Sequence, residues 1–319
     1  MTYSNVSFSL GSLKPELSLD LIKKIKNKGI KILILEGASS NLTSWYFIIF
    51  RKILGLKVIL WACGWQPESH SKVVRKLKNA IERIFFNNVD SIIGYSTTAM
   101  KYFRGIGVTK PITIAYNGID TELYYESKDQ IFKSAKLLKP KNNNKIFLYV
   151  GGIFIEKRVK FLIDCFKELH KTFPNTCLWI IGDGPLKKEF EISVKTDHIL
   201  DIEFLGRIEK GVEPYFAAAD FLVMPGIGGL ALNQAMLWKT PCIVSEADGT
   251  EDDLVLDNNT GFRFIKNNKR SLLNAMTRAI SLTDEKYQEM SRNAQSLILN
   301  ISNTDQMLNV FTEEIEKLA

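Results

Sequence analysis

Short runs rich in Ile, Leu and Val alternate along this chain with segments whose apolar residues recur at helical spacing. In the first part, this pattern predicts strands over 30–35, 56–62, 89–95 and 112–116, and helices over 44–54 and 73–86. Strands separated by helices favour βαβ units and therefore a parallel sheet.

A second alternating series begins at residue 145. It predicts strands over 145–150, 178–181, 202–205 and 220–224, and helices over 159–172, 185–195 and 213–218. Two such series indicate an α/β protein with two Rossmann-like, doubly wound domains.

A segment rich in Lys and Asn separates the two series and holds a lone proline, Pro140. We therefore predict a first domain over 1–124, a linker over 125–144 and a second domain over 145–285. The remaining residues, 286–319, are predicted to form C-terminal helices that pack back on the first domain.

Length and composition suit a globular protein, since 319 residues with 45% hydrophobic content can form two ordinary cores. No apolar run of membrane-spanning length occurs, and the first ten residues lack the features of a signal peptide, so we expect a cytoplasmic location. The four cysteines form no CxxC pair, which argues against a zinc site or a disulfide framework.

Charge is unevenly distributed between the two parts. Residues 1–119 carry 17 Lys and Arg against 6 Asp and Glu, a net charge of +11, and the remaining 25 basic and 29 acidic residues give −4. The basic part suggests an anionic partner such as a membrane surface, although solvated lysines on helix faces are an equally weighted alternative. No aromatic stacking platform is interleaved with these charges, so we expect no nucleic-acid partner.

The most informative segment is a glycine-rich turn that feeds into a helix, at 224–244. Gly226, Gly228 and Gly229 would let a diphosphate approach the backbone, where the N–H groups at the helix N-terminus favour an anion. This turn suggests a nucleotide-binding site.

Two more glycine turns follow predicted strands. Gly151 and Gly152 precede the cations Lys157 and Arg158, and a further turn holds Gly182 and Gly184. Each turn alone is most simply a tight connection between a strand and a helix. Together they lie at the carboxyl ends of successive strands, where open α/β sheets bind ligands in one crevice.

Several short motifs occur in a characteristic order. The second part contains YVGGIFIEKRVKFLI, IIGDGP, IEFLGRI, AAADFLVMPG, GLALNQAM and PCIV, and the first contains WACGW, IIGYSTTAMKYF and YNGID. In this order they resemble the group 1 (family 4) retaining glycosyltransferases of GT-B fold, over roughly residues 30–265. The resemblance implies a nucleotide-sugar donor as substrate, with no resident cofactor and no metal.

The resemblance also assigns roles to matching residues. Gly151 corresponds to the donor-phosphate loop, and Lys157 to the lysine that neutralises the diphosphate. Gly206 and Arg207 correspond to the loop at the edge of the nucleobase. Gly229 and Leu230 begin the helix whose N-terminus faces the phosphates, and Gly182 and Gly184 belong to the same donor site.

Departures from the family pattern fall at polar positions. Gly226 and Gln234 stand where the family has two glutamates, and Gly152 stands where it has an arginine, for which Arg158 could substitute. Cys63 replaces a histidine in WACGW and remains a candidate contact to acceptor or sugar.

A replacement carboxylate could come from the acidic loop, with Glu251 as the candidate contact to sugar or acceptor and Glu246, Asp248 and Asp252 as alternatives. A solvated acidic loop is an equally weighted interpretation.

The first domain is short for this family, because only some thirty residues precede the strand at 30–35. We therefore expect a truncated N-terminal domain, which would indicate a naturally shortened member, a misassigned start or an incomplete domain.

The resemblance implies transfer of a sugar from a nucleotide-sugar donor to a glycan or lipid-linked acceptor, in surface polysaccharide biosynthesis at the inner face of the cytoplasmic membrane. The alternative is a degenerate, non-catalytic homologue that binds a nucleotide sugar or a partner glycosyltransferase. The basic segments 23–31 and 73–86 would hold anionic lipid headgroups. We expect that attraction to be purely electrostatic, because the first 119 residues contain no apolar anchor.

Overall fold

The computed structural model describes residues 5–7, 16–18, 24–25, 27–64, 71–140, 145–196, 201–247 and 249–319. The chain forms two compact units. Unit 1 comprises Met1–Tyr116 with Met307–Ala319, and unit 2 comprises Asn117–Gln306.

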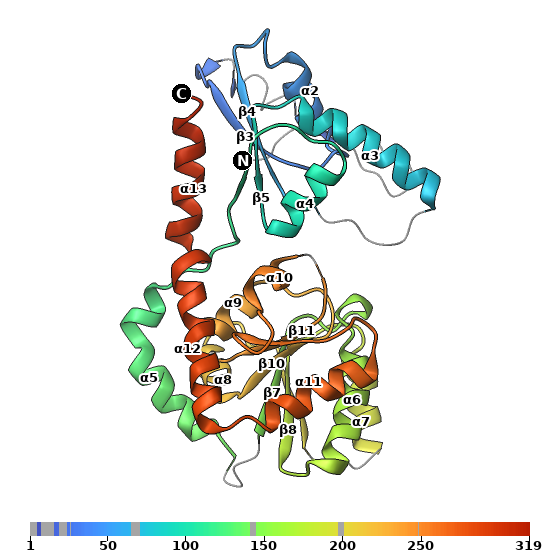
Figure 1. Cartoon of the computed structure of the whole chain (residues 1–319), viewed down its shortest axis with the longest axis vertical. Coiled ribbons are helices and arrows are strands. Elements are labelled where there is room, and N and C mark those ends of the chain that lie inside the picture. Colours follow the sequence, from blue (N-terminus) through green and yellow to red (C-terminus); the bar gives the residue numbers. More distant parts are fainter. Residues whose placement is uncertain are drawn as a thin grey trace. The chain divides into compact units, whose positions relative to one another are not determined.

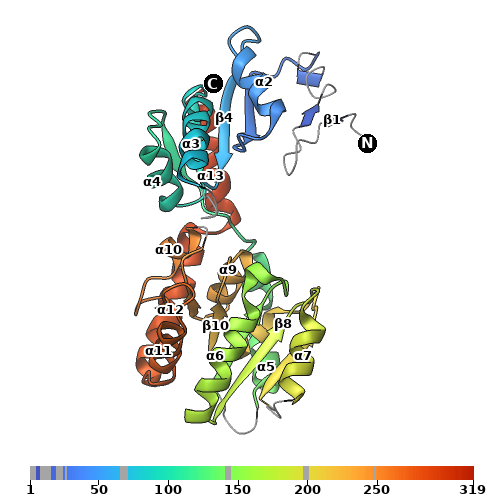
Figure 2. The same cartoon turned by 90° about the vertical axis from the view of Figure 1, so that its right-hand side faces the viewer.

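Unit 1 is built on a parallel four-stranded sheet of order β3-β4-β5-β6 (Figures 1 and 2). Its strands are β3 (Ile32–Glu36), β4 (Lys57–Ala62), β5 (Ser91–Gly94) and β6 (Ile112–Ile114), and β1 (Asn5–Ser7) pairs antiparallel with β2 (Glu16–Ser18). Its helices are α2 (Leu42–Phe50), α3 (Lys72–Asn87), α4 (Thr97–Gly105) and the part of α13 (Thr304–Glu316) from Met307 onward. Every strand and helix predicted for 30–116 is confirmed, with its ends shifted by a few residues.

Helix α13 is fastened to the sheet of unit 1 by the buried carboxylate of Glu314, which is 3% exposed. It accepts hydrogen bonds from Ser91 Oγ at 2.9 Å, Thr113 Oγ1 at 2.8 Å and Lys317 Nζ at 2.6 Å. Burial alone would raise the pKa of Glu314, but the bonds from Lys317, Thr113 and Ser91 outweigh it and hold the pKa below its usual value. The carboxylate thus satisfies two sheet hydroxyls that α13 would otherwise cover without partners.

Unit 2 contains a parallel six-stranded sheet of order β12-β11-β10-β7-β8-β9. Its strands are β7 (Lys145–Val150), β8 (Thr176–Ile181), β9 (Ile202–Gly206), β10 (Phe221–Met224), β11 (Cys242–Val244) and β12 (Gly261–Arg263). All except β9, in which only Ile202 is buried, are largely buried, as near-continuous apolar runs in a sheet covered on both faces should be. The second predicted βα series is therefore confirmed.

Helices cover both faces of this sheet (Figure 1). One group comprises α5 (Glu122–Leu138), α8 (Glu213–Ala218), α9 (Leu230–Leu237) and α12 (Asp284–Ile301), and the other includes α6 (Val159–Thr172) packed against α11 (Lys269–Ile280). The remaining elements are α7 (Lys187–Thr196), α10 (Thr250–Leu254) and a 3₁₀ turn, η1 (Ile155–Lys157). Within the described ranges, no helix is both long and apolar enough to cross a membrane.

The predicted linker over 125–144 is wrong for most of its length, because Glu122–Leu138 forms helix α5 of unit 2. The Lys-rich composition masked a helical row of buried residues, Tyr124, Ile131 and Ala135, with which α5 packs against α8. The boundary between the units falls after Tyr116. The predicted return of 286–319 to the first domain holds only from Met307, because α12 belongs to unit 2.

Candidate functional site

The order of the sheet in unit 2 fixes where a ligand site can form. Strand β7 is the first of its series, yet it lies between β10 and β8, so the strand order reverses between β7 and β10. Ligands of open α/β sheets bind at the carboxyl ends of the strands beside such a reversal. The loops that follow β7 and β10 are therefore the elements to examine.

The glycine turns after β7, β8 and β9 are joined by main-chain hydrogen bonds. Gly151 N–H donates to Ile181 O at 3.0 Å, and Gly182 N–H donates to Gly206 O at 2.8 Å. A Cβ on Gly182 would overlap the carbonyl oxygen of Gly151, and one on Gly184 would lie 2.5 Å from that of Ile153. These glycines are thus explained first by close packing of the loops, which brings the ends of β7, β8 and β9 together. The sequence predicts convergence of the turns after β7, β8 and β10 instead.

Lys157 joins the β7 loop to the β10 loop across the reversal point. Its Nζ donates to Ile227 O at 2.7 Å and to Gly228 O at 2.9 Å. Gly226 lies so close to the Glu156 carbonyl that any side chain there would collide with it. The structure therefore brings Lys157 together with the glycine turn, and the lysine is half-buried rather than exposed.

Glu251, on α10, holds the same turn from the other side. Its side chain is 1% exposed, and Gly228 N–H donates to its Oε1 at 3.1 Å. A Cβ on Gly228 would lie only 2.5 Å from that oxygen, so a side chain there would displace the Glu251 carboxylate. Glu251 thus lies within the donor-side loop cluster, while its predicted contact with a sugar or acceptor stays a prediction.

The N-terminus of α9, which follows this turn, has open space beside its first residue. Gly229 precedes the helix with a φ of +134°, and a Cβ there would meet no atom within 4 Å. Leu230 is 49% exposed. Gln234, one turn further along, is half-buried, and its side-chain amide has no hydrogen-bond partner among the described residues.

Sequence reasoning missed Asn233, which fixes α9 in place. It is 1% exposed, and its Nδ2 donates to Asn117 O at 3.1 Å and to Ser302 Oγ at 2.7 Å. The only signal for it in the sequence was an Asn directly before Gln234, within a segment predicted to form a helix. Its role here is to hold the helix whose N-terminus belongs to the site.

Arg158 carries two unusual features. It adopts a left-handed backbone conformation, with φ +55°, at the start of α6, where glycine is the more common residue. Its Nη1 is buried without a hydrogen-bond partner among the described residues. Buried guanidinium N–H groups are normally paired, so the unpaired Nη1 is an exception that the described residues do not explain.

A side chain at Gly152, where the family has an arginine, would displace the ring of Phe154 in this chain. The ring of Phe154 lies 2.5 Å from where a Cβ would be, and Tyr149 Oη donates to Gly152 O at 2.8 Å. Burial raises the pKa of Tyr149 well above its usual value, so this donor stays protonated. Arg158 is therefore the remaining arginine of this loop.

Other predicted positions lie at the periphery of unit 2. Arg207 is largely exposed and forms an ion pair with Glu209 at 3.2 Å. In the acidic loop, Glu246 is exposed, Asp252 is paired with Arg263, and Asp248 lies outside the described residues. Across the described part of the chain, no group of three or more His, Cys, Asp and Glu is arranged to hold a metal ion.

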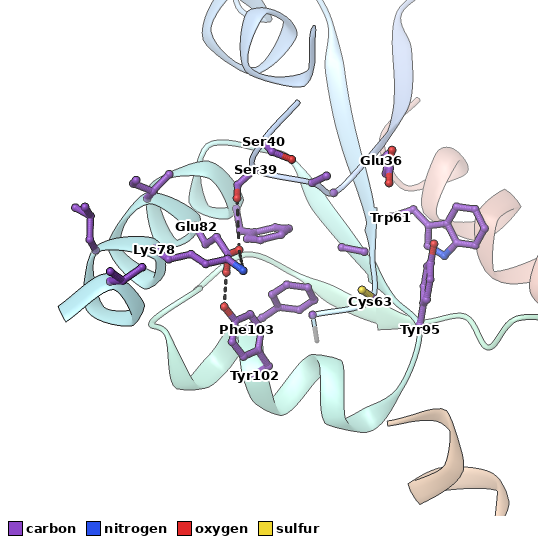
Figure 3. Close-up of a pocket in the computed structure, with 18 residues that line it drawn as sticks. Glu36, Ser39, Ser40, Trp61, Cys63, Lys78, Glu82, Tyr95, Tyr102 and Phe103 are labelled. Atoms are coloured by element: carbon purple, nitrogen blue, oxygen red, sulfur yellow. Dashed lines mark hydrogen bonds and ion pairs between the residues drawn. The ribbon is translucent and has the colours of Figure 1, made fainter. Parts of the chain in front are cut away.

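Cys63 belongs to unit 1, so the structure does not group it with the donor-side loops. It is exposed and lines a pocket beside the carboxyl ends of β3 and β4 (Figure 3). Its neighbour Gly64 has a φ of +60°, and a Cβ there would lie 2.9 Å from the Ala99 backbone. The second tryptophan of WACGW lies outside the described residues.

Comparison with known proteins places the chain in a family. The family model described as "Glycosyl transferases group 1" matches residues 129–297, more than half of the chain, and "Glycosyltransferase Family 4" matches residues 3–123. The protein belongs to the group 1 glycosyltransferases, and its fold class is that of the GT-B members.

Two curated relatives are similar to this chain over part of its length. One is the UDP-Gal:alpha-D-GlcNAc-diphosphoundecaprenol alpha-1,3-galactosyltransferase of Escherichia coli, 28% identical over 59% of this chain and 50% of the relative. The other is the alpha-monoglucosyldiacylglycerol synthase of Acholeplasma laidlawii, 29% identical over 49% of this chain and 41% of the relative. The chain thus spans half or less of the length of these relatives.

Solved structures confirm the fold. Anabaena HepE in complex with UDP superposes with a TM-score of 0.77 at 19% identity, covering 93% of this chain and 82% of the other. The lipopolysaccharide outer core galactosyltransferase WaaB gives a TM-score of 0.71 at 18% identity, covering 93% and 78%.

Proposed function

We propose that this protein is a retaining glycosyltransferase that moves a sugar from a nucleotide-sugar donor to a glycan or lipid-linked acceptor in surface polysaccharide biosynthesis. The observation that supports it most directly is the glycine turn at the sheet reversal, held by Lys157 on its carbonyls and by Glu251 on an amide. The curated relatives, whose names describe transfer to a diphosphoundecaprenol-linked sugar and synthesis of a glycolipid, support the acceptor class.

The chemistry requires stabilisation of a leaving group. As the bond between the sugar C1 and the phosphate oxygen breaks, the electron pair stays on the nucleoside diphosphate, which gains negative charge. Lys157, the buried Nη1 of Arg158 and the N-terminus of α9 would meet that charge with preorganised positive groups. Gly151, Gly182 and Gly206 would keep the loop backbones close around the diphosphate.

We expect the transfer to continue in the presence of EDTA, since cationic side chains and helix N–H groups would supply the charge that a divalent ion supplies elsewhere. The measurement is donor turnover before and after chelation, with Mg²⁺ and Mn²⁺ added back. A strict requirement for either ion would show that the leaving group is stabilised by another site.

Gln234 is proposed to bind a ribose or sugar hydroxyl, because its amide is unpaired and lies one turn from the phosphate end of α9. Gln234→Ala should weaken donor binding by about 0.5–1.5 kcal/mol, the range for a neutral hydrogen bond, and Gln234→Glu should be tolerated. Isothermal titration with the donor measures this, with Gln288→Ala on the exposed side of α12 as a control. Equal affinities for all three variants and the unaltered protein would place Gln234 outside the donor site.

Helix α3 supports peripheral attachment to a membrane with anionic lipids, and its exposed apolar residues suggest an apolar contribution beside the electrostatic one expected from sequence. Phe85 and Phe86 are buried, but Val73 is 76%, Leu77 64% and Ile84 56% accessible. At about 100° per residue they form one stripe, and Arg75 and Lys76 lie outside it. We propose that this stripe enters the lipid interface while the cations contact headgroups.

The decisive experiment is an assay of the purified full chain against a panel of UDP-, GDP- and dTDP-sugars. Donor hydrolysis or transfer is the expected result. Binding of a nucleotide sugar with no turnover, even with a sugar-lipid acceptor present, would contradict the proposal and favour the non-catalytic homologue, which the loss of both family glutamates would then explain.

A further inference from the structure

Unit 2 contains a pocket of about 590 Å³ that lies at the opposite end of its sheet from the glycine turns. It is lined by residues in or just after the C-terminal parts of α5, α8 and α9, and by the first half of α12. These four helices cover the same face of the sheet (Figure 1), and α5, α8 and α9 each lead into the amino end of a strand. A cavity of this volume is within the range that holds a small molecule.

Small side chains leave this space open where two helices meet. Helices α5 and α8 pack against each other, and Ala135 and Ala217 line the pocket between them. Phe132 and Trp238 form an aromatic wall, with their ring centres 6.0 Å apart and the rings edge to face. The hollow is therefore bounded by rigid, packed elements.

The hydroxyl of Tyr287, which also lines the pocket, brings no charge to it. Its Oη donates to Asp220 O at 3.2 Å, and burial raises the pKa of Tyr287 well above its usual value, so the group stays neutral. Lys145 Nζ lies 5.4 Å from the centre of the Tyr287 ring, but the Asp220 carboxylate at 3.5 Å offsets its charge. The charge of the pocket therefore comes from its other lining residues.

Three lysines line the pocket, Lys136 and Lys139 from α5 and Lys239 from the turn after α9. Its lining residues, all within the described part of the chain, include no Asp or Glu. Other lysines of unit 2 are paired, as Lys160 is with Asp164 at 2.7 Å, whereas none of these three forms an ion pair among the described residues. Like charges around one cavity repel each other, and a bound anion would relieve that repulsion.

The helix dipole offers a simpler reason for lysines at these positions, since a cation is stabilised near a helix C-terminus. Among the described residues, however, none of the three ammonium groups donates to a helix carbonyl. Lys239 also adopts a left-handed backbone, with φ +66°, directly after α9, where glycine is the more common residue. Its Nζ lies 5.8 Å from the centre of the Phe132 ring in the pocket wall. The dipole does not explain why a lysine occupies this glycine position.

We propose that this pocket binds a small multivalent phosphate anion, such as pyrophosphate or a short polyphosphate, on Lys136, Lys139 and Lys239. Each ammonium group offers three donors and no acceptor, which suits phosphate oxygens. A metal ion or a group that only donates hydrogen bonds would meet unpaired cations instead. The inference goes beyond the proposed function and does not depend on it, because the pocket lies away from the donor-side loops.

The test measures how fast each lysine is acetylated by sulfosuccinimidyl acetate, with peptide mass spectrometry to resolve the sites. Saturating pyrophosphate, without divalent ions, should slow acetylation of the three pocket lysines about fivefold or more, because ammonium groups held by phosphate are poor nucleophiles. Lys133 on α5 and Lys286 on α12 are exposed, lie outside the pocket and should react at an unchanged rate. Sulfate at equal ionic strength should be about tenfold less effective by concentration, since a single anionic group cannot reach several lysines at once.

Two variants connect the protection to these lysines. Lys136→Gln with Lys239→Gln should raise the pyrophosphate concentration that half-protects Lys139 about tenfold or more, because two charged donors are lost. Lys133→Gln with Lys286→Gln removes the same charge from the same unit and is the matched control. Lys239→Gly alone should raise that concentration about fivefold, and glycine adopts the left-handed backbone without strain, so the fold is kept. Thermal unfolding of each variant checks that unit 2 is intact.

Four results would overturn the proposal. Equal slowing at Lys133 and Lys286 would show general charge screening, and equal protection by sulfate would show an unselective cluster of cations. Protection of Lys157 without the pocket lysines would place the anion at the donor-side loops. Unchanged protection of Lys139 in both the double variant and Lys239→Gly would remove these lysines from the site. Sugar transfer is not measured, so the result is independent of the proposed function.

Discussion

Replacement of Lys157 by Ala should lower the rate of sugar transfer by a factor on the order of 10² to 10³. The expected size is that for removal of one preorganised group that stabilises transition-state charge. Lys157 is the cation at the reversal point of the sheet, and its Nζ contacts the glycine turn directly. Single-turnover measurements with saturating donor would separate this loss of rate from weaker binding.

A structural contribution must be measured alongside, since Lys157 also holds the carbonyls of Ile227 and Gly228 and is not simply an exposed side chain. Lys160→Ala is the matched control, because Lys160 lies on α6 one turn away and is 64% exposed in a pair with Asp164. Thermal unfolding of both variants shows whether unit 2 remains intact. Unchanged turnover in folded Lys157→Ala would remove Lys157 from the chemistry.

The βα alternation was predictable from sequence because most strands of unit 2 are buried and so consist largely of apolar residues. The edge strand β9, with its exposed Glu203, is the exception. Strand β7 was predicted with its observed ends, and α6 and α8 likewise. Such runs indicate strands that are buried on both faces of a sheet. They can be recognised in a short stretch of sequence.

Helix α5 escaped the same reasoning because its surface is rich in Lys and its buried residues are widely spaced. It packs against α8 and Trp238, which are distant in sequence. Packing of this kind between remote segments overrides local composition, and a single sequence does not display it.

The site was predicted in part for a similar reason. The strand-end glycines predicted a ligand crevice at the ends of the strands. Their packing against neighbouring carbonyls, as at Gly182, was not predictable because it depends on the strand order of the sheet. The buried position of Glu251 under Gly228 is likewise a tertiary feature, because the two are brought together only by folding of the loops after β10 and β11. The left-handed backbone of Arg158 is likewise not indicated by its sequence.

Binding of the protein to anionic vesicles should have two separable parts, both carried by α3. Substitution of Lys72, Arg75 and Lys76 by Gln should reduce binding on the order of 10²-fold at low salt, since each basic residue near such a surface contributes about 1 kcal/mol. Substitution of Val73 and Ile84 by Ser should instead remove the part of the binding that persists at high salt, because burial of apolar area is not screened.

These two apolar residues are chosen because they belong to the exposed stripe of α3 but do not line the pocket of unit 1. Val73→Ser with Ile84→Ser should therefore lower the affinity for vesicles by roughly a factor of 10². Co-sedimentation with vesicles of neutral and of anionic lipid, across a salt series, measures both parts. If binding is sensitive to salt but unchanged by the apolar substitutions, the contact is purely electrostatic, as expected from sequence. If none of the substitutions in α3 changes the binding to vesicles, α3 does not contact the membrane, and its exposed apolar stripe must bind another partner.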